Sequence, residues 1–225
     1  MNSHRSDIPP GGLMSPRAFS ISVAAAAVLL ALSVISWVRF DRELMAWMNG
    51  WKGPILDVAF VMITWLGSLA VLAPLTIVIA SMLIRAGRRM EARLMAIGVG
   101  GAVLAVFALK RLVHRPRPNL FPPVIPLPSD PSFPSGHAAQ VGAACICLFL
   151  IVRQLRQRTG SGWYGAVAAA LTATVGISRI YLQVHYPSDV LAGVAIALLW
   201  CAGVARFGIG ERSGRKTANT PGQCQ

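Results

Sequence analysis

The side chains that could do chemistry are gathered in three short segments of this 225-residue chain. The segments read "KRLVHRPRP" (110–118), "PSGH" (134–137) and "SRIYLQVHYPSD" (178–189). Their cations can bind an oxyanion, and their histidines can attack a reacting centre or move a proton. The candidate residues are Lys110, Arg117, Ser135, Gly136, His137, Arg179, His185 and Asp189. Three cations and two imidazoles are typical of a site for phosphoryl transfer.

In the first segment, Arg115 and Arg117 each precede a proline, which favours an extended backbone at both positions. We therefore expect the preceding helix to end near Lys110–His114. Arg117 would then lie away from the helix axis, free to bind an oxyanion through two N–H groups. Arg111, His114 and Arg115 are weaker candidates, for which contact with lipid headgroups is expected.

The second segment lies in "PSFPSGHAAQ", a pattern that predicts the start of a helix. Ser132 is the expected cap and Pro134 is expected in the first turn. The amides of Ser135, Gly136 and His137 would then be unpaired at the positive end of the helix dipole. Such an end binds anions, and the His137 imidazole beside it could donate a proton to a leaving group.

The third segment predicts a turn followed by a helix whose first residue is Pro187. His185 would precede this helix, and Asp189 would lie in its first turn. The turn could bring the Asp189 carboxylate onto one imidazole nitrogen, which fixes the tautomer and leaves the other nitrogen free to attack. The alternative is that Asp189 only stabilises the start of the helix.

Apolar runs separate these segments, because 55% of the residues are hydrophobic and only 13% are charged. Runs of about 20 apolar residues match the length needed to cross a bilayer. We expect an all-α membrane protein, a six-transmembrane-helix bundle with a short interfacial helix after the first span. That short helix would begin at Pro54, with Asp57 in its first turn, and 119–134 would be an irregular loop. The predicted spans cover about 18–38, 67–83, 94–109, 135–152, 163–177 and 187–207.

The positive charges predict how the bundle is oriented. Of the 21 Lys and Arg residues, 13 fall in segments on one side of the six spans, which the positive-inside rule makes cytoplasmic. The three segments that carry the candidate site residues (110–118, 134–137 and 178–189) would then all lie at the outer face. We expect a disordered cytoplasmic lead (1–17), the membrane domain (18–207) and a cytoplasmic polar tail (208–225).

Composition and spacing exclude other classes of function. The net charge of +13 could suggest nucleic acid, but the basic residues flank the apolar runs and form no separate domain. Cys145, Cys147, Cys201 and Cys224 have neither metal-site spacing nor a disulfide framework, so we expect them to serve packing. The sequence has neither a cluster of carboxylates nor a His-x-x-x-His pair of the kind that binds a metal ion. We therefore expect no cofactor and metal-independent chemistry.

The three segments together resemble the type 2 phosphatidic acid phosphatase (PAP2) superfamily of membrane phosphatases. Lys-x6-Arg-Pro matches 110–118, Pro-Ser-Gly-His matches 134–137 and Ser-Arg-x5-His-x3-Asp matches 178–189, in the family's order. The resemblance implies that His185 is the nucleophile, Asp189 its orienting partner and His137 the general acid. It implies that the phosphate is held by Lys110, Arg117, Ser135, Gly136 and Arg179.

The resemblance also implies a substrate class, lipid phosphates or diphosphates hydrolysed without metal. An outward-facing site favours undecaprenyl diphosphate first, and phosphatidic acid or phosphatidylglycerophosphate next. The soluble vanadium haloperoxidases share the motifs, but the spans argue against that branch. Two other classes stay open: an intramembrane serine hydrolase with Ser135 as nucleophile, and a non-catalytic lipid-phosphate-binding protein. The oligomeric state is not readable, because small residues in spans pack helices within or between subunits.

Overall fold

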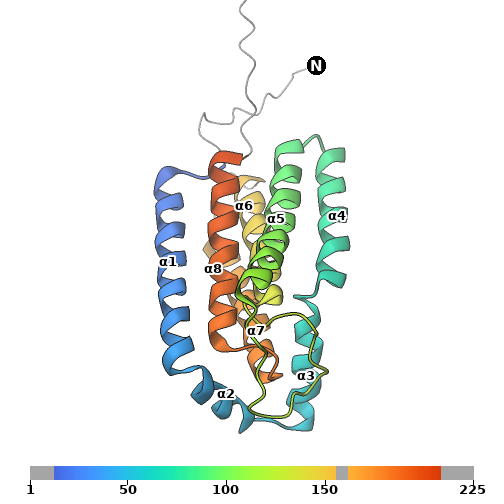
Figure 1. The fold of residues 1–225 in the computed structure, drawn as a ribbon. Helices are drawn as coiled ribbons and strands as arrows, with labels where there is room; N and C mark the ends of the chain where they lie inside the picture. The colour runs from blue at the N-terminus through green and yellow to red at the C-terminus, as the bar shows by residue number, and fades with distance from the viewer. Residues whose placement is uncertain (1–12, 156–161, 209–225) are drawn as a thin grey trace, which may run out of the picture.

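The computed structural model describes residues 13–155 and 162–208, and every regular element in these ranges is a helix. Figure 1 shows the resulting bundle. The helices are α1 (Pro16–Arg39), α2 (Asp41–Asn49), α3 (Pro54–Trp65), α4 (Leu69–Arg85), α5 (Arg89–Val113), α6 (Gly136–Leu155), α7 (Gly162–Tyr181) and α8 (Pro187–Gly203), continued by a π-helical turn (Val204–Gly208). The all-α prediction is confirmed for the described residues. Most of the predicted lead and tail, together with Cys224, lies outside them.

Five helical stretches are long and apolar enough to cross a membrane. They are α1, Pro54–Arg85 (α3 with α4), α5, α6 and Pro187–Phe207. The helix at the remaining predicted span, α7, has 20 residues, but Gly, Thr, Ser and Tyr residues and Arg179 dilute its apolar character. The count of six spans therefore stays a prediction.

Small residues let α8 pack closely among α1, α5 and α6 in the middle of the bundle (Figure 1). At Gly193, a Cβ atom would lie 2.6 Å from the Ser135 carbonyl oxygen, so a larger residue would push α8 away from the start of α6. Cys145, Cys147 and Cys201 are buried free thiols in this core, as their expected packing role requires. The close packing holds the start of α6 against the first turns of α8.

Two short helices, not one, connect α1 to α4. Because Phe40 breaks the helix after Arg39, the chain turns into α2 before it reaches α3. α3 begins at Pro54 as predicted, and Asp57 lies in its first turn, where it accepts a 2.7 Å hydrogen bond from the Tyr181 hydroxyl. Both helices lie at the lower end of the bundle in Figure 1.

The irregular loop between α5 and α6 also lies at this lower end (Figure 1). α5 ends at Val113, and His114 caps it in the left-handed conformation with φ 49°. The following residues contain no helix up to Gly136, as the proline content predicts, and the Phe133–Pro134 peptide bond is cis. The loop, α2, α3 and the α7–α8 turn therefore meet at one end of the bundle.

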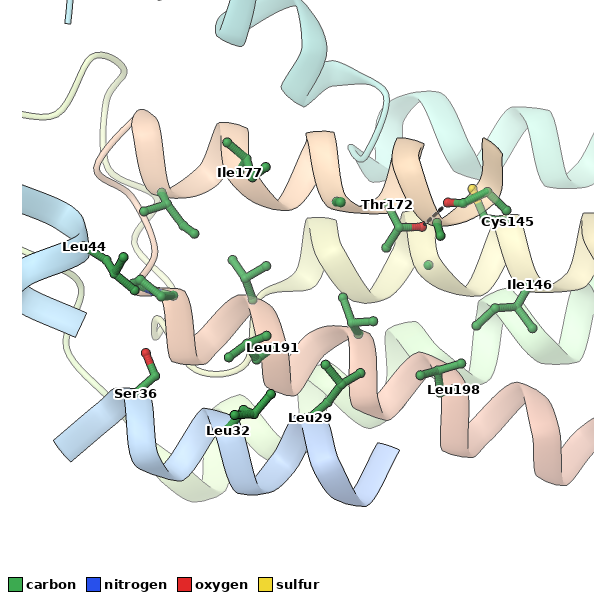
Figure 2. Close-up of a pocket in the computed structure, with 18 of the residues that line it drawn as sticks. Leu29, Leu32, Ser36, Leu44, Cys145, Ile146, Thr172, Ile177, Leu191 and Leu198 are labelled. Atoms are coloured by element: carbon green, nitrogen blue, oxygen red, sulfur yellow. Dashed lines mark hydrogen bonds between the residues drawn. The ribbon is translucent and has the colours of Figure 1, made fainter. Parts of the chain in front are cut away.

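An apolar cavity of about 750 Å³ lies between α1, α6, α7 and α8 (Figure 2). Its lining includes Leu32, Ile146, Leu191 and Leu198. None of the predicted site residues lines it.

Candidate active site

His185 lies in the tight turn between α7 and α8, and the turn itself is held at several points. Gln183 takes the left-handed conformation (φ 61°), and its side-chain amide donates to the Met45 carbonyl of α2 at 3.1 Å. The amides of Val184 and His185 both donate to the Arg179 carbonyl, at 3.2 and 3.3 Å. The backbone is thus fixed on two helices, and His185 is only 2% exposed.

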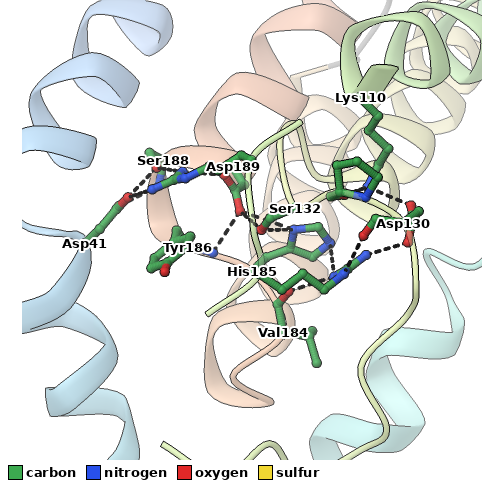
Figure 3. Close-up of polar contacts among 12 residues, drawn as sticks. Asp41, Lys110, Asp130, Ser132, Val184, His185, Tyr186, Ser188 and Asp189 are labelled. Carbon is green, nitrogen blue, oxygen red and sulfur yellow. Dashed lines mark hydrogen bonds and ion pairs between the residues drawn. The ribbon is translucent and has the colours of Figure 1, made fainter. Parts of the chain in front are cut away.

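The structure brings Asp189 onto His185 as the sequence predicts (Figure 3). α8 begins at Pro187, and the Asp189 carboxylate accepts the Tyr186 amide at 3.0 Å, which closes a capping box. The same carboxylate oxygen, Oδ2, lies 3.3 Å from His185 Nδ1. A proton on Nδ1 therefore has an acceptor, and the Nε2 lone pair faces away from the carboxylate.

Arg117 approaches the other nitrogen of this ring. Its Nη1 lies 3.3 Å from His185 Nε2 and donates to the Val184 carbonyl at 2.7 Å. The third predicted segment is therefore in direct contact with the first.

A carboxylate from the α5–α6 loop lies between the cations of the first segment. Asp130 accepts from Arg117 Nη2 at 2.7 Å, and its other oxygen lies 2.8 Å from Lys110 Nζ (Figure 3). The Asp130 side chain is 51% exposed, whereas those of Lys110 and Arg117 are nearly buried. Partial burial raises the pKa of Asp130, but hydrogen bonds and charge from the two cations outweigh it and lower the pKa to about 2. We call Lys110, Arg117 and Asp130 the loop cluster.

Two buried donors of the predicted site have no hydrogen-bond partner within the described residues: Ser135 Oγ, fully buried, and Arg179 Nε. Arg179 Nη1 donates to Thr64 of α3 at 2.7 Å, which aims the guanidinium. Buried donors without acceptors are rare and indicate a missing partner. His137 is in electrostatic range of Arg179, Arg117, Lys110 and His185, so all three predicted segments converge.

Three expectations for the second segment are wrong. α6 begins at Gly136, so Pro134 precedes the helix, and Ser132 does not cap it. The Ser132 amide donates to the Arg115 carbonyl at 2.8 Å, and its hydroxyl donates to Asp189 Oδ2. The Ser135 amide is not free either, because α8 lies close enough for Asp189 to accept it through its carbonyl at 2.9 Å. The amides of Gly136 and His137 remain in the first turn of α6, where helices lack internal acceptors.

Arg115, expected at lipid headgroups, is buried in the protein. Its guanidinium lies 2.5 Å from Asp189 Oδ1 and 2.7 Å from Asp41 Oδ2, and two carboxylates supply the charge that makes such burial tolerable. The rings of Trp37 and Tyr186 lie at 3.9 and 4.0 Å from it. Arg111 and His114 do stay exposed.

Asp41, at the start of α2, is a residue that sequence reasoning missed. Its carboxylate accepts the Ser188 amide and the Ser36 hydroxyl, each at 2.9 Å, in addition to Arg115. Ser188 also donates through its hydroxyl to Asp41 and accepts from Arg115. We call Asp41, Arg115, Ser188 and Asp189 the buried cluster. An acidic residue three positions after the end of the predicted span at Val38 was the available signal, because a carboxylate at such a place needs a cation.

The protein environment keeps the His185 imidazole neutral at neutral pH. Burial lowers the pKa of His185 to about 4, the Asp189 carboxylate raises it, and the charges of Arg179 and Arg117 lower it. A neutral ring with its proton on Nδ1 presents an unprotonated Nε2 beside the cations. In residues 13–155 and 162–208, no group of three or more His, Cys, Asp or Glu side chains is placed to hold a metal ion. The arrangement can bind an oxyanion and attack its centre.

Comparisons with known proteins match this chain to phosphatases. The sequence profile of the PAP2 superfamily matches residues 91–211. Phosphatidylglycerophosphatase B of Bacillus subtilis is 33% identical over 66% of this chain and 73% of its own length. Decaprenylphosphoryl-5-phosphoribose phosphatase of Mycobacterium tuberculosis is 36% identical over 53% of this chain and 63% of its own. The crystal structure of a transmembrane PAP2 type phosphatidylglycerolphosphate phosphatase from Bacillus subtilis matches with TM-score 0.71 and 28% identity, over 80% of this chain and 92% of that one.

Proposed function

This chain belongs to the PAP2 superfamily, and on that premise we propose that it is a membrane lipid phosphatase that works through a phosphohistidine intermediate. The observation that carries the proposal is a His185–Asp189 pair together with two buried donors, Arg179 Nε and Ser135 Oγ, that have no acceptor among the described residues. A phosphate group would supply the missing acceptor. The roles given to single residues below are part of this proposal.

In the first step, the substrate phosphate lies among Lys110, Arg117, Arg179, the Ser135 hydroxyl and the amides at Gly136 and His137. Arg117 would transfer its Nη1 hydrogen bond from His185 Nε2 to a phosphate oxygen, which frees the nitrogen lone pair. His185 Nε2 attacks phosphorus, and the bond from phosphorus to the bridging oxygen breaks. His137, whose protonated form the bound phosphate anion would favour, gives its proton to that oxygen. The lipid leaves as an alcohol, or as a monophosphate when the substrate is a diphosphate.

In the second step, water attacks the phosphorus of phosphohistidine. His137, now neutral, accepts a proton from this water, and the bond between phosphorus and Nε2 breaks to release inorganic phosphate. Asp189 balances the positive charge that the His185 ring carries while it is bonded to phosphorus. The side chains present supply each proton and charge in this scheme, so we expect hydrolysis to proceed without a metal ion.

The lipid itself is the less determined part of the proposal. The relatives include a phosphatase for a phosphatidylglycerophosphate and one for a decaprenyl lipid, so both glycerol-based and polyprenyl tails are represented. We retain undecaprenyl diphosphate as the first candidate, and phosphatidic acid or phosphatidylglycerophosphate as the alternatives. A panel of these substrates with one purified preparation would rank them by kcat/KM.

We further propose six spans, with α4 forming the second, the predicted interfacial helix α3 preceding it, and α7 forming the fifth. A helix of 20 residues such as α7 is about 30 Å long, enough to cross the hydrocarbon core. The Leu13 amide donates to the Ala205 carbonyl at 2.8 Å, so the chain enters α1 and leaves α8 at the same end. The charge distribution makes this end cytoplasmic, so the site faces the periplasm or exterior of a bacterial inner membrane.

Phosphate release from lipid diphosphate and monophosphate, measured with purified protein in EDTA, tests the activity. We expect turnover in EDTA, inhibition by vanadate, and loss of turnover in His185→Ala. The serine hydrolase alternative predicts the reverse pattern, with Ser135→Ala inactive and His185→Ala near the wild-type rate. A preparation that binds vanadate but releases no phosphate from any lipid would favour the non-catalytic binding protein.

A reporter fused after Gln225 tests the orientation. We expect the reporter to behave as cytoplasmic, and a periplasmic signal would overturn both the topology and the outer-leaflet substrate.

A further inference from the structure

We propose that Asp41 and Arg115 are positioning residues for the His185 nucleophile, acting through Asp189; the proposal rests on the function proposed above. Arg115 contacts the carboxylate that faces His185, and Asp41 contacts Arg115, so the chain of contacts runs from α2 to Nδ1 of the His185 ring, the nitrogen opposite the attacking Nε2 (Figure 3). The motifs of the sequence contain Asp189 but assign no role to Asp41 or Arg115.

The contacts of Asp189 explain why Arg115 can orient it. Oδ1 accepts from Arg115 Nη1 at 2.5 Å, whereas Oδ2 accepts the Tyr186 amide at 3.0 Å and the Ser132 hydroxyl. Rotation of the carboxylate would break contacts at both oxygens. Oδ2 is therefore held towards His185 Nδ1, which determines the tautomer and the direction of the Nε2 lone pair.

Arg115 is itself immobilised on the side away from Asp189. Its Nη2 lies 2.7 Å from Asp41, its Nη1 donates to the Ser188 hydroxyl at 2.7 Å, and the Trp37 ring lies at 3.9 Å. Asp41 in turn accepts the Ser188 amide at 2.9 Å, which ties it to the first turn of α8. Residue Arg115 as a whole is only 8% exposed, so water screens little of the charge on its guanidinium.

Charge gives Arg115 a second effect on the nucleophile. The charged and titratable groups that face His185 are Asp189 on α8, Arg117 in the loop, Arg179 on α7 and His137 on α6. Arg115 offsets the negative charge of Asp189. Without it, more of that charge would act on the imidazole and keep it protonated, and unable to attack, up to a higher pH.

Steady-state kinetics of Arg115→Gln and Asp41→Asn in detergent or nanodiscs test the proposal. Matched controls are Arg111→Gln at the exposed end of α5 and Glu43→Gln on the exposed face of α2. A nucleophile displaced by about 1 Å can lose about 10²-fold in rate, so we expect this loss in kcat for Arg115→Gln and a smaller loss for Asp41→Asn. We expect vanadate affinity to stay at the wild-type value, since neither residue belongs to the phosphate site, and both controls to behave as wild type.

Two further measurements separate positioning from general damage. The acid limb of kcat/KM should move to higher pH in Arg115→Gln and stay in place in Arg115→Lys, which keeps the charge. In an Asp189→Asn background, Arg115→Gln should cause little additional loss, because both changes act on one carboxylate.

Wild-type kcat and an unmoved acid limb in folded, vanadate-binding Arg115→Gln would overturn the positioning role while the phosphatase function stands. If Arg115→Gln does not fold, normal kcat in Asp41→Asn together with a shifted limb in Arg115→Lys would overturn it equally. A wild-type protein that hydrolyses no lipid phosphate would instead refute the proposed function.

Discussion

The buried cluster has one cation between two aspartates, the loop cluster has one aspartate between two cations, and each cluster contacts His185 through one member. They differ in how far their aspartates are exposed to solvent. In the buried cluster, Asp41 and Asp189 are 3% and 0% exposed and every carboxylate oxygen has protein donors. In the loop cluster, the Asp130 side chain is half exposed and lies on a loop. The first arrangement can hold a nucleophile in place, whereas the second can exchange its carboxylate for another anion. On this basis we expect the charges of the buried cluster to act as structural support and the Asp130 carboxylate to be replaceable.

Removal of the Asp189 charge should have the largest effect on this comparison. In Asp189→Asn, the amide no longer stabilises a positive His185 ring, and it can favour the wrong tautomer, so we expect kcat to fall by about 10⁴-fold. Phosphate release under single-turnover conditions would measure it. An equal loss in Asp130→Asn would erase the distinction between the two clusters.

Stability should separate the clusters next. Arg115→Gln leaves two buried carboxylates without their cation, and breaking such a pair costs about 3–5 kcal/mol. Asp130→Asn removes a half-exposed partner, for which about 0–1 kcal/mol is expected. Thermal unfolding of both variants in the same detergent measures the difference, and equal melting temperatures would contradict the assignment of Arg115 as buried support.

The pH dependence of wild-type kcat/KM tests how the protein environment sets the protonation of His185, which the buried cluster orients through Asp189. The pKa of His185 is lowered to about 4, so the ring is neutral and nucleophilic above this value and protonated below it. We expect kcat/KM to fall about tenfold for each pH unit below about 4. A pH–rate profile with an acid limb near 6.5, the ordinary imidazole value, would mean that burial does not set the protonation of the nucleophile.

The smallest predicted effect tests whether Asp130 is replaceable. A phosphate that binds Lys110 and Arg117 must displace the Asp130 carboxylate, so Asp130→Asn should tighten vanadate binding by up to about fivefold, equivalent to about 1 kcal/mol. Inhibition constants for vanadate in the variant and in the Glu43→Gln control measure it. Weaker binding in Asp130→Asn would mean that Asp130 supports the cations rather than competing for them.

The sequence predicted those parts of the site that depend on local spacing. Pro187 starts α8, and the turn before it brings Asp189 to His185, because proline, turn and first helical residue are neighbours in the chain. The end of α5 near His114 was predicted for the same reason, since prolines follow it directly. These features need only a few residues of context.

The parts that could not be predicted depend on contacts between distant residues. Arg115 and Asp41 are 74 positions apart, and nothing in the spacing of "HRPRP" indicates that its first arginine is buried. Ser132 is a reasonable cap on local grounds, but Asp189 binds its hydroxyl instead. The sequence predicted one short helix, α3, after the first span, and the structure has α2 as well. The additional helix likewise depends on distant contacts, because α2 packs against α7 and α8.

The position of Asp41 has a consequence for the design of chimeric proteins from this chain. The recognisable family segment starts at residue 91, whereas the carboxylate that anchors Arg115 comes from α2, well upstream of it. A chimera that transplants only 91–211 would carry the histidines and every motif cation but would leave the arginine behind them with a single counter-ion. Grafts intended to exchange lipid preference should therefore take the first two helices along with the catalytic half.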